Sequence, residues 1–402
     1  MRLSEAIPKL ESLNVEGAKV FLRVDMNLPI DSSGEIMDET KVRQAARTVR
    51  ELLNRGAAVV VGTHQGRPGK TDFVSTERHA QILSEILGQE VVWVDSVLGR
   101  SAREAIDSLR PGEVLFLENL RFHSEENIEG PPDLLLRTHF VKRLAPLFDA
   151  YVNDAFQAAH RSQPSLVAFP YILPSAAGRL MEDMIREMEE IDSAEGSRLF
   201  ILGGAKVLDK LRVMEHALRS GRVYEVLCGG LIGIIMAMAA GNRIEAQLPP
   251  LKEFQIVLLA ARGILEKFDG RVFYPVDFIV EGEDGRRIVA PVYSVPRGRI
   301  GDIGPGTVEV FADRIRLADV VVANGPMGIF EEPEYRRGTI EIVRAAASAR
   351  RESILCGGHL SVAASLAKVG GARVYTAGGA VMYRLAGLPL PAVDALIGGR
   401  GP

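Results

Sequence analysis

Basic and polar side chains follow four short apolar runs in the first half of the chain. These runs, written together with the polar residues after them, are Phe21–Asn27, Val59–Arg67, Val114–Arg121 and Tyr151–Arg161. Guanidinium groups match the planar geometry of carboxylates and phosphates and bind them through two hydrogen bonds at once. The first half therefore predicts a binding site for a small, strongly anionic molecule.

Paired glycines follow the apolar runs of the second half instead: Gly203-Gly204, Gly229-Gly230, Gly357-Gly358 and Gly378-Gly379. Glycine at a strand-to-helix turn lets backbone N–H groups approach a phosphate or a flat base closely. One such pair is most often only a turn, but its recurrence after successive runs indicates a nucleotide site. An acid site and a nucleotide site in one chain suit phosphoryl transfer.

Two well-known nucleotide motifs are missing from the sequence. No glycine is followed five residues later by Gly-Lys-Ser or Gly-Lys-Thr, which argues against a P-loop kinase. No three-glycine dinucleotide fingerprint opens a helix after the first apolar run, which weakens a dehydrogenase interpretation.

The apolar runs that bear these residues alternate with longer segments of helical period. Such alternation predicts parallel strands covered by helices on both faces, in which ligands bind beyond the carboxyl ends of the strands. A length of 402 residues exceeds one ordinary core and predicts two similar-sized, doubly wound α/β domains. A periodic stripe between Leu180 and Ile191 predicts an interdomain helix, and Pro164, Pro170 and Pro174 before it indicate a loop. We therefore expect an acid-binding domain over 1–173, a connecting helix over 174–195 and a nucleotide domain over 196–387.

Composition excludes several other classes of protein. With 47% hydrophobic residues, 25% charged residues and a net charge of −4, the chain is expected to be a soluble globular protein that binds neither nucleic acid nor membranes. It has no apolar leader and no apolar stretch of membrane-spanning length, which predicts a cytoplasmic location. Cys228 and Cys356 are too few for a disulfide framework, so we expect two small residues packed at strand ends.

Eight longer strings together resemble the phosphoglycerate kinase family, and its archaeal members most of all. In chain order they are Arg23–Pro29, Thr63–Pro68, Glu118–Phe122, Asn153–Phe156, Ala159–Arg161, Gly203–Lys210, Asn324–Glu331 and Cys356–His359. The resemblance implies reversible phosphoryl transfer between 1,3-bisphosphoglycerate and ADP, giving 3-phosphoglycerate and ATP, in glycolysis or gluconeogenesis. It also implies Mg²⁺ carried with the nucleotide, a monomer or small homo-oligomer, a hinge between the domains, and a tail from about Leu388 that packs on the first domain.

The same resemblance implies roles for individual residues. The acid substrate would be bound by Asp25, Asn27, His64, Arg67, Arg121, His160 and Arg161. The nucleotide would be bound by Gly203, Gly204, Ala205, Lys210, Gly229, Gly230, Asn324, Pro326, Glu331 and His359. The transferring phosphoryl group would be met by Lys41, Lys206, Gly357 and Gly358.

Two positions depart from the family pattern. The family's catalytic arginine falls on Lys41, which supplies a positive charge without the planar fork. Arg43 is the alternative, although it lies about 200° further around a helix. His359 stands where many members carry an aspartate near Mg²⁺, and imidazole is a poor ligand for that ion, so we expect no direct side-chain ligand for the metal.

These departures leave two rival functions open. One is a related kinase that acts on another phosphorylated small acid, and the other is a non-catalytic nucleotide- or metabolite-binding homologue. A degenerating site would lose several of its functional residues, so the second rival is opposed by the retained Lys206, Lys210, His64, Arg67, Arg121 and Arg161.

Overall fold

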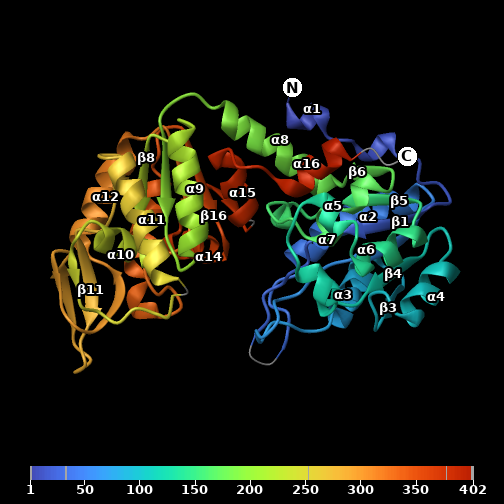
Figure 1. Cartoon of the computed structure of the whole chain (residues 1–402), viewed down its shortest axis with the longest axis horizontal. Helices are drawn as coiled ribbons and strands as arrows, with labels where there is room; N and C mark the ends of the chain where they lie inside the picture. Colours follow the sequence, from blue (N-terminus) through green and yellow to red (C-terminus); the bar gives the residue numbers. More distant parts are fainter. Residues whose placement is uncertain (1, 32–33, 252, 377, 400–402) are drawn as a thin grey trace. The chain divides into compact units, whose positions relative to one another are not determined.

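The computed structural model describes residues 2–31, 34–251, 253–376 and 378–399. The chain forms two compact units (Figure 1). The first unit holds Met1–Glu190 together with Pro389–Pro402, and the second holds Ile191–Leu388. The chain passes from one unit to the other within helix α8 (Arg179–Ser193) and returns after Leu388.

The first unit is built on a six-stranded sheet in which every strand pair is parallel. The sheet order is β3-β4-β2-β1-β5-β6. The strands are β1 (Lys19–Arg23), β2 (Ala58–Gly62), β3 (Val91–Val94), β4 (Val114–Leu117), β5 (Ala150–Asn153) and β6 (Ser175–Ala177). Its helices, besides most of α8, are α1 (Leu3–Ala6), α2 (Thr40–Asn54), α3 (Glu77–Leu87), α4 (Arg100–Ser108), α5 (Pro132–Leu135), α6 (His139–Leu144), α7 (Pro164–Val167) and α16 (Pro391–Gly398).

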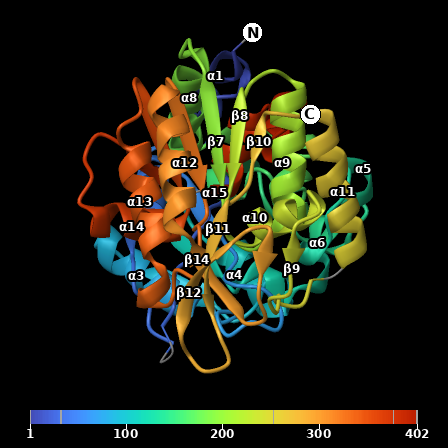
Figure 2. The same cartoon turned by 90° about the vertical axis from the view of Figure 1, so that its left-hand side faces the viewer.

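The second unit repeats this architecture with a second parallel sheet, in the order β10-β8-β7-β15-β16-β17. Figure 2 shows α9, α10 and α11 on one face of this sheet and α12, α13 and α14 on the other. The strands are β7 (Arg198–Leu202), β8 (Glu225–Cys228), β10 (Val272–Phe273), β15 (Val320–Asn324), β16 (Glu352–Cys356) and β17 (Arg373–Tyr375). The helices are α9 (Val207–Arg219), α10 (Gly230–Ala239), α11 (Phe254–Lys267), α12 (Pro305–Leu317), α13 (Arg337–Ala346), α14 (Gly358–Ala367) and α15 (Gly378–Ala386).

Both sheets confirm the expected fold class of two doubly wound α/β domains. Their central strands are buried along their whole length, as strands covered on both faces must be. Cys228 and Cys356 are buried at the ends of β8 and β16, where burial raises the pKa of each thiol to about 12. This placement confirms that both cysteines are packing residues.

A small antiparallel sheet in the second unit was not expected from the sequence. It consists of β12 (Arg287–Pro291), β11 (Asp277–Glu281) and β14 (Arg299–Ile303). A further short pair joins β9 (Arg243–Ile244) to β13 (Ser294–Val295). These strands carry exposed apolar residues such as Ile288 and Val289, so they lack the continuous buried runs that marked the parallel strands.

The loop expected around Pro164, Pro170 and Pro174 is wrong. The segment forms α7, a 3₁₀ turn over Phe169–Tyr171 and β6, and most of it is buried in the first unit. Proline is tolerated in the first turn of a helix, where its missing N–H is not needed, so Pro164 and Pro170 lie in the first turns of short helices here. Pro174 directly precedes β6. Helix α16 packs on this segment, and the backbone N–H of Ala392 donates to the Ala159 carbonyl at 3.1 Å.

Among the described residues no single helix is both long and apolar enough to cross a membrane. The consecutive helices α15 and α16 reach the necessary length and apolar composition only when they are taken together. Both bury apolar side chains within the protein.

Candidate active site

The predicted acid-binding residues of the first unit follow four neighbouring strands of its sheet. Asp25 comes after β1, His64 after β2, Arg121 after β4, and Arg161 after β5. Since these strands are parallel and adjacent in the order β4-β2-β1-β5, their carboxyl ends meet at one edge of the sheet. The structure therefore gathers residues that are far apart in the sequence.

Arg67, Arg121 and Arg161 form a basic cluster at this edge, in which the charges of Arg67 and Arg161 both act on Arg121. Arg121 Nη1 donates to the Gly66 carbonyl at 2.6 Å, and the side chain is almost fully buried. Burial lowers the pKa of Arg121 to about 10, and the positive charges of Arg161, Arg23 and Arg67 contribute in the same direction. Cations held this close to one another favour an anionic ligand, which would relieve their repulsion. His160 lies beside Arg161, half-buried like it.

Lys41, near the start of α2, is bound to the residues that follow β1. Its Nζ donates to Asp25 Oδ1 at 3.1 Å and to the Asn27 carbonyl at 2.9 Å. Burial by itself would raise the pKa of Asp25, but the charge of Lys41 and the Asn27 N–H outweigh it, so that pKa is lowered. The Asn27 side chain in turn accepts a hydrogen bond from the Gly66 N–H at 2.8 Å. Lys41 is therefore held against the residues that directly follow β1.

Arg43, the alternative to Lys41, lies in a different environment. Its side chain is 65% exposed and pairs with Glu39 at 2.8 Å, one helical turn away. By contrast, the Lys41 side chain is only 19% exposed. The structure thus brings Lys41, and not Arg43, into contact with Asp25 and Asn27.

Two acidic residues near this cluster are helix caps. The Asp154 carboxylate accepts hydrogen bonds from Thr48 Oγ1 at 2.7 Å and from the Met181 N–H in the first turn of α8 at 3.1 Å. Glu118 accepts from the Thr76 N–H, at the start of α3, at 2.8 Å. Both contacts give these carboxylates structural roles.

Sequence reasoning gave no role to a buried set of residues beneath His64. Arg23, at the end of β1, contacts His64 and also Ser165, which contacts Glu126. Arg23, Ser165 and Glu126 are fully buried. An arginine inside a short apolar strand was the one signal in the sequence, since a buried guanidinium needs partners.

In the second unit, the paired glycines follow β7, β8, β16 and β17, and the pairs after β7 and β8 pack on the loop after β15. A Cβ at Gly203 would lie 2.2 Å from the Pro326 carbonyl oxygen, and one at Gly230 would lie 2.6 Å from the Gly204 nitrogen. The Gly204 N–H donates to the Pro326 carbonyl at 2.8 Å. The glycines are thus required by close backbone approach within the protein.

The backbone amides of five of these glycines are already used within the protein, so they are not free to bind a phosphate. The N–H groups of Gly203, Gly204, Gly229, Gly230 and Gly357 all donate to protein carbonyl oxygens. The strands and loops approach so closely that the protein uses these donors itself. A flat ring can still pack on such a surface, because packing needs no free N–H. Gly358 differs, since it opens α14 and a Cβ there would meet nothing within 4 Å.

Lys206 and Lys210, the two lysines predicted to act at the nucleotide, lie in different surroundings. Lys206 is exposed at the N-cap of α9, and the preceding Ala205 is exposed as well. Lys210 is buried one turn later, and its Nζ donates to both carbonyl oxygens of Asn324, with 2.9 Å to the backbone oxygen. Burial lowers the pKa of Lys210 to about 7. Asn324 also donates from Nδ2 to the Cys356 carbonyl at 3.0 Å, which fixes the orientation of its amide.

His359 lies at the start of α14 and pairs with Glu331. Its Nε2 is 3.0 Å from Glu331 Oε1, and its ring lies near that of Phe330. Both side chains are exposed, so they remain accessible to a ligand. Within the described part of the chain, no group of three His, Cys, Asp or Glu side chains could hold a metal ion by itself.

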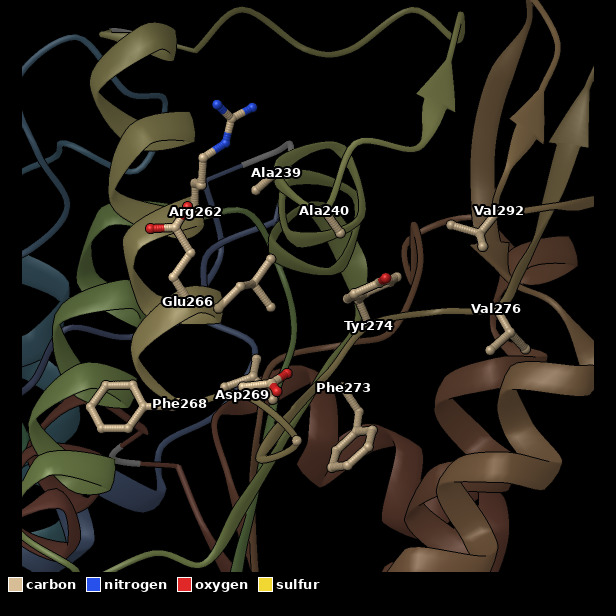
Figure 3. A pocket seen from close by; sticks show the side chains of 13 residues that line it. Ala239, Ala240, Arg262, Glu266, Phe268, Asp269, Phe273, Tyr274, Val276 and Val292 are labelled. Carbon is tan, nitrogen blue, oxygen red and sulfur yellow. The ribbon is translucent and has the colours of Figure 1, made fainter.

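A pocket of about 830 Å³ opens in the second unit between the end of α10, helix α11 and the segment around β10 (Figure 3). Its lining includes Arg262, Glu266, Asp269 and Tyr274. None of the residues predicted to bind the nucleotide lines it. This pocket is therefore separate from the candidate active site.

The chain forms two doubly wound α/β units. One unit carries a guanidinium cluster, and the other carries glycine turns and two lysines at a helix start. This combination defines a kinase of the two-domain α/β class. The family model described as phosphoglycerate kinase matches residues 10–388. The phosphoglycerate kinase of Aeropyrum pernix is 43% identical, over 96% of this chain and 95% of its own length. That of Methanothermobacter thermautotrophicus is 41% identical, over 98% and 97%.

A solved structure agrees with these relatives. The crystal structure of phosphoglycerate kinase from Pyrococcus horikoshii is similar with a TM-score of 0.82 and 38% identity, covering 97% of this chain and 98% of that one. The chain belongs to the phosphoglycerate kinase family. It is accordingly a phosphotransferase whose acceptor is a carboxyl group.

Proposed function

We propose that this chain catalyses reversible phosphoryl transfer between 1,3-bisphosphoglycerate and ADP through Lys41 and the basic cluster of the first unit. The observation that carries the proposal is the ion pair of Lys41 with the buried Asp25, at 3.1 Å. It holds the ammonium group beside the residues at the end of β1 and leaves Arg43 outside. The family membership supports the reaction, and no observation favours either rival function.

The basic cluster would hold the acid substrate through charge. Arg67, Arg121 and Arg161 would bind the phosphate, since charge-assisted hydrogen bonds from guanidinium groups to a dianion are strong. Asp25 and Asn27 would bind the glycerate hydroxyl and orient the acid, and His64 and His160 would complete the site. Burial of Arg121 supports this assignment, because a buried cation interacts more strongly with an anion than an exposed one.

The second unit would hold the nucleotide. Adenine would pack on the flat surface of Gly203, Gly204, Gly229 and Gly230, with Ala205 and Pro326 at its edges. The ribose would meet Glu331, and the phosphates would meet Lys210, Asn324, His359 and the start of α14. The open space at Gly358 supports the last contact, since a helix N-terminus attracts phosphate.

Transfer would need no covalent enzyme intermediate. The phosphoryl group would pass in line between the acid and the nucleotide, with Lys41, Lys206, Gly357 and Gly358 around it, so that catalysis is positioning and charge neutralisation. Because the acid and the nucleotide bind different units, the units would have to come together during turnover. The prolines of the sequence suggest a hinge near Pro164–Gly178, but the packing of that segment within the first unit argues against a hinge there.

Mg²⁺ would enter with the nucleotide. Its chemistry there would be to neutralise the negative charge of the nucleotide phosphates and of the phosphoryl group that passes between nucleotide and carboxyl oxygen. The residues present fit an ion bound through phosphate and water, because His359 is already paired with Glu331 and imidazole suits Mg²⁺ poorly. We also expect a cytoplasmic enzyme that is a monomer or a small homo-oligomer.

A coupled assay with 3-phosphoglycerate, ATP and Mg²⁺ tests the proposal. We expect saturable turnover that other phosphorylated small acids do not match at equal concentration. Arg121→Met should abolish saturation by 3-phosphoglycerate and leave ATP binding intact. Normal ATP binding with no turnover of 3-phosphoglycerate would refute the proposal.

A further inference from the structure

The contact between Arg23 and His64 determines which imidazole nitrogen carries the proton. Arg23 Nη2 lies 3.0 Å from His64 Nδ1, in a hydrogen bond between two buried side chains. A guanidinium group has only N–H donors and offers no acceptor. Nδ1 must therefore be the acceptor, which makes the imidazole neutral and puts its hydrogen on Nε2.

Arg23 is itself held by partners on all sides. Its Nε donates to Ser165 Oγ at 2.7 Å, and its Nη1 donates to the Val24 carbonyl. Ser165 donates from its backbone N–H to Glu126 Oε2 at 3.0 Å and from its hydroxyl to Oε1. Glu126 Oε1 is also 3.9 Å from Arg23 Nη2. Since all of these side chains are fully buried, the guanidinium group cannot turn away from His64.

The surroundings of His64 also disfavour a charged ring. The pKa of His64 is lowered well below its usual value, first by burial and then by the charges of Arg23, Arg121 and Arg161, while Asp25 opposes them. His64 thus faces three guanidinium groups and one carboxylate, and that carboxylate is already paired with Lys41. A positive imidazole would add to the repulsion within the basic cluster.

We propose that Arg23 is a positioning residue that holds His64 as the neutral Nε2–H tautomer, so that His64 offers the acid substrate an uncharged hydrogen-bond donor. The positive charge of the site then comes from Arg67, Arg121 and Arg161, and His64 orients the substrate through one hydrogen bond. The part that concerns the substrate rests on the proposed function. The tautomer itself does not depend on it.

Nitrogen NMR of histidine-labelled protein tests the tautomer directly in the free enzyme. We expect His64 Nδ1 to resonate as an unprotonated nitrogen and Nε2 as a protonated one throughout pH 5.5–8. The spectrum of His64→Gln assigns the signals. A protonated Nδ1 within this range would overturn the proposal, whether or not 3-phosphoglycerate proves to be the substrate.

Ser165→Ala tests the role of Arg23 with little risk to the fold, because it removes one acceptor of Arg23 and leaves the charge pair with Glu126. We expect a mixture of both neutral tautomers of His64 and a rise in KM for 3-phosphoglycerate, with kcat at saturation unchanged. An unaltered tautomer in both Ser165→Ala and the more drastic Arg23→Met variant, which removes every donor from this position, would show that Arg23 does not position His64.

Two substitutions of His64 test the substrate contact. Glutamine places its amide N–H near the position of Nε2, whereas asparagine places it near Nδ1. We expect His64→Asn to raise KM for 3-phosphoglycerate about tenfold or more, as for a lost hydrogen bond to a charged group, and His64→Gln to raise it much less. Equal KM values in the two variants would overturn the donor role. Absence of all turnover in the unmodified enzyme would instead refute the proposed function.

Discussion

Replacing Lys41 with methionine separates the catalytic role of its charge from its structural role. Methionine keeps most of the length of the side chain and removes the ammonium group that lies 3.1 Å from Asp25 Oδ1. Loss of one preorganised charge at the reacting group lowers kcat by about 10²–10³ in comparable sites. We therefore expect kcat of Lys41→Met to fall by about that factor.

The same change should also destabilise the first unit. Removing one partner of a buried ion pair costs about 3–5 kcal/mol, because the remaining charge is left without compensation. Asp25 is only 7% exposed, but Lys41 is 19% exposed and the Asn27 N–H still donates to Asp25. We expect about 3 kcal/mol, the low end of the range. That loss corresponds to roughly 6–12 °C in Tm for a domain of this size.

A double variant distinguishes the two effects. In Lys41→Met/Asp25→Asn the buried carboxylate is gone, so most of the stability should return while kcat stays low. Arg43→Ala is the matched control, because it removes a positive charge from the same helix. Arg43 is exposed, and its pair with Glu39 is worth only about 0.3–0.5 kcal/mol.

The measurements are steady-state kinetics at saturating 3-phosphoglycerate and ATP, and thermal unfolding followed by circular dichroism. If Lys41→Met retained kcat within about threefold of the parent while Arg43→Ala lost it, the assignment of Lys41 would be refuted. If both variants were fully active, neither residue would replace the arginine of the family. A double variant that regained kcat together with stability would show that the charge acts only on folding.

Three further predictions concern packing and buried charges. Gly203→Ala should lower the free energy of unfolding in urea by about 1–3 kcal/mol, because its Cβ would lie 2.2 Å from the Pro326 carbonyl oxygen. Gly358→Ala should keep the parent's stability and weaken ATP binding measured by calorimetry. Equal stabilities of the two variants would contradict this pair of predictions. Burial lowers the pKa of Lys210 from 10.5 to about 7, so between these pH values the unfolded chain binds more protons than the folded one. The free energy of unfolding should therefore rise with pH over this interval. Lys210→Met should remove the rise, and an unchanged slope in that variant would contradict the prediction. Burial raises the pKa of Asp154 from 3.8 to about 6, so stability should fall as pH rises through that interval, and Asp154→Asn should show a flatter profile in unfolding titrations. A parent protein whose stability did not change over that interval would disprove the last prediction.

Much of the fold could be predicted from local patterns. The apolar runs at Val59–Val61 and Val320–Ala323 are strands because a strand covered on both faces must be apolar throughout. The carboxyl ends of parallel strands are the expected ligand edge, and that rule located Asp25, His64 and Arg121 before their contacts were known. The antiparallel strands around Phe278 escaped prediction because exposed apolar residues, Ile288 and Val289, interrupt the buried pattern.

The contacts of buried polar groups could not be predicted in the same way. Gly204 donates its amide to Pro326, more than a hundred residues later in the chain, and no local pattern shows that this donor is already used. Similarly, Lys210 follows Lys206 by one helical turn, yet only the packed unit turns it toward Asn324. Such groups find whichever partners the assembled strands bring close, since a buried donor without an acceptor is costly.

The sequence by itself therefore determined the two doubly wound sheets, the family and the set of charged side chains at the strand ends. These follow from residue types and spacing, which act over a few neighbouring residues. Only the tertiary structure decided that Lys41 rather than Arg43 meets Asp25, and that Arg23 fixes the proton of His64. Those choices depend on burial and on distances between distant segments, where desolvation makes each unpaired charge or donor unfavourable.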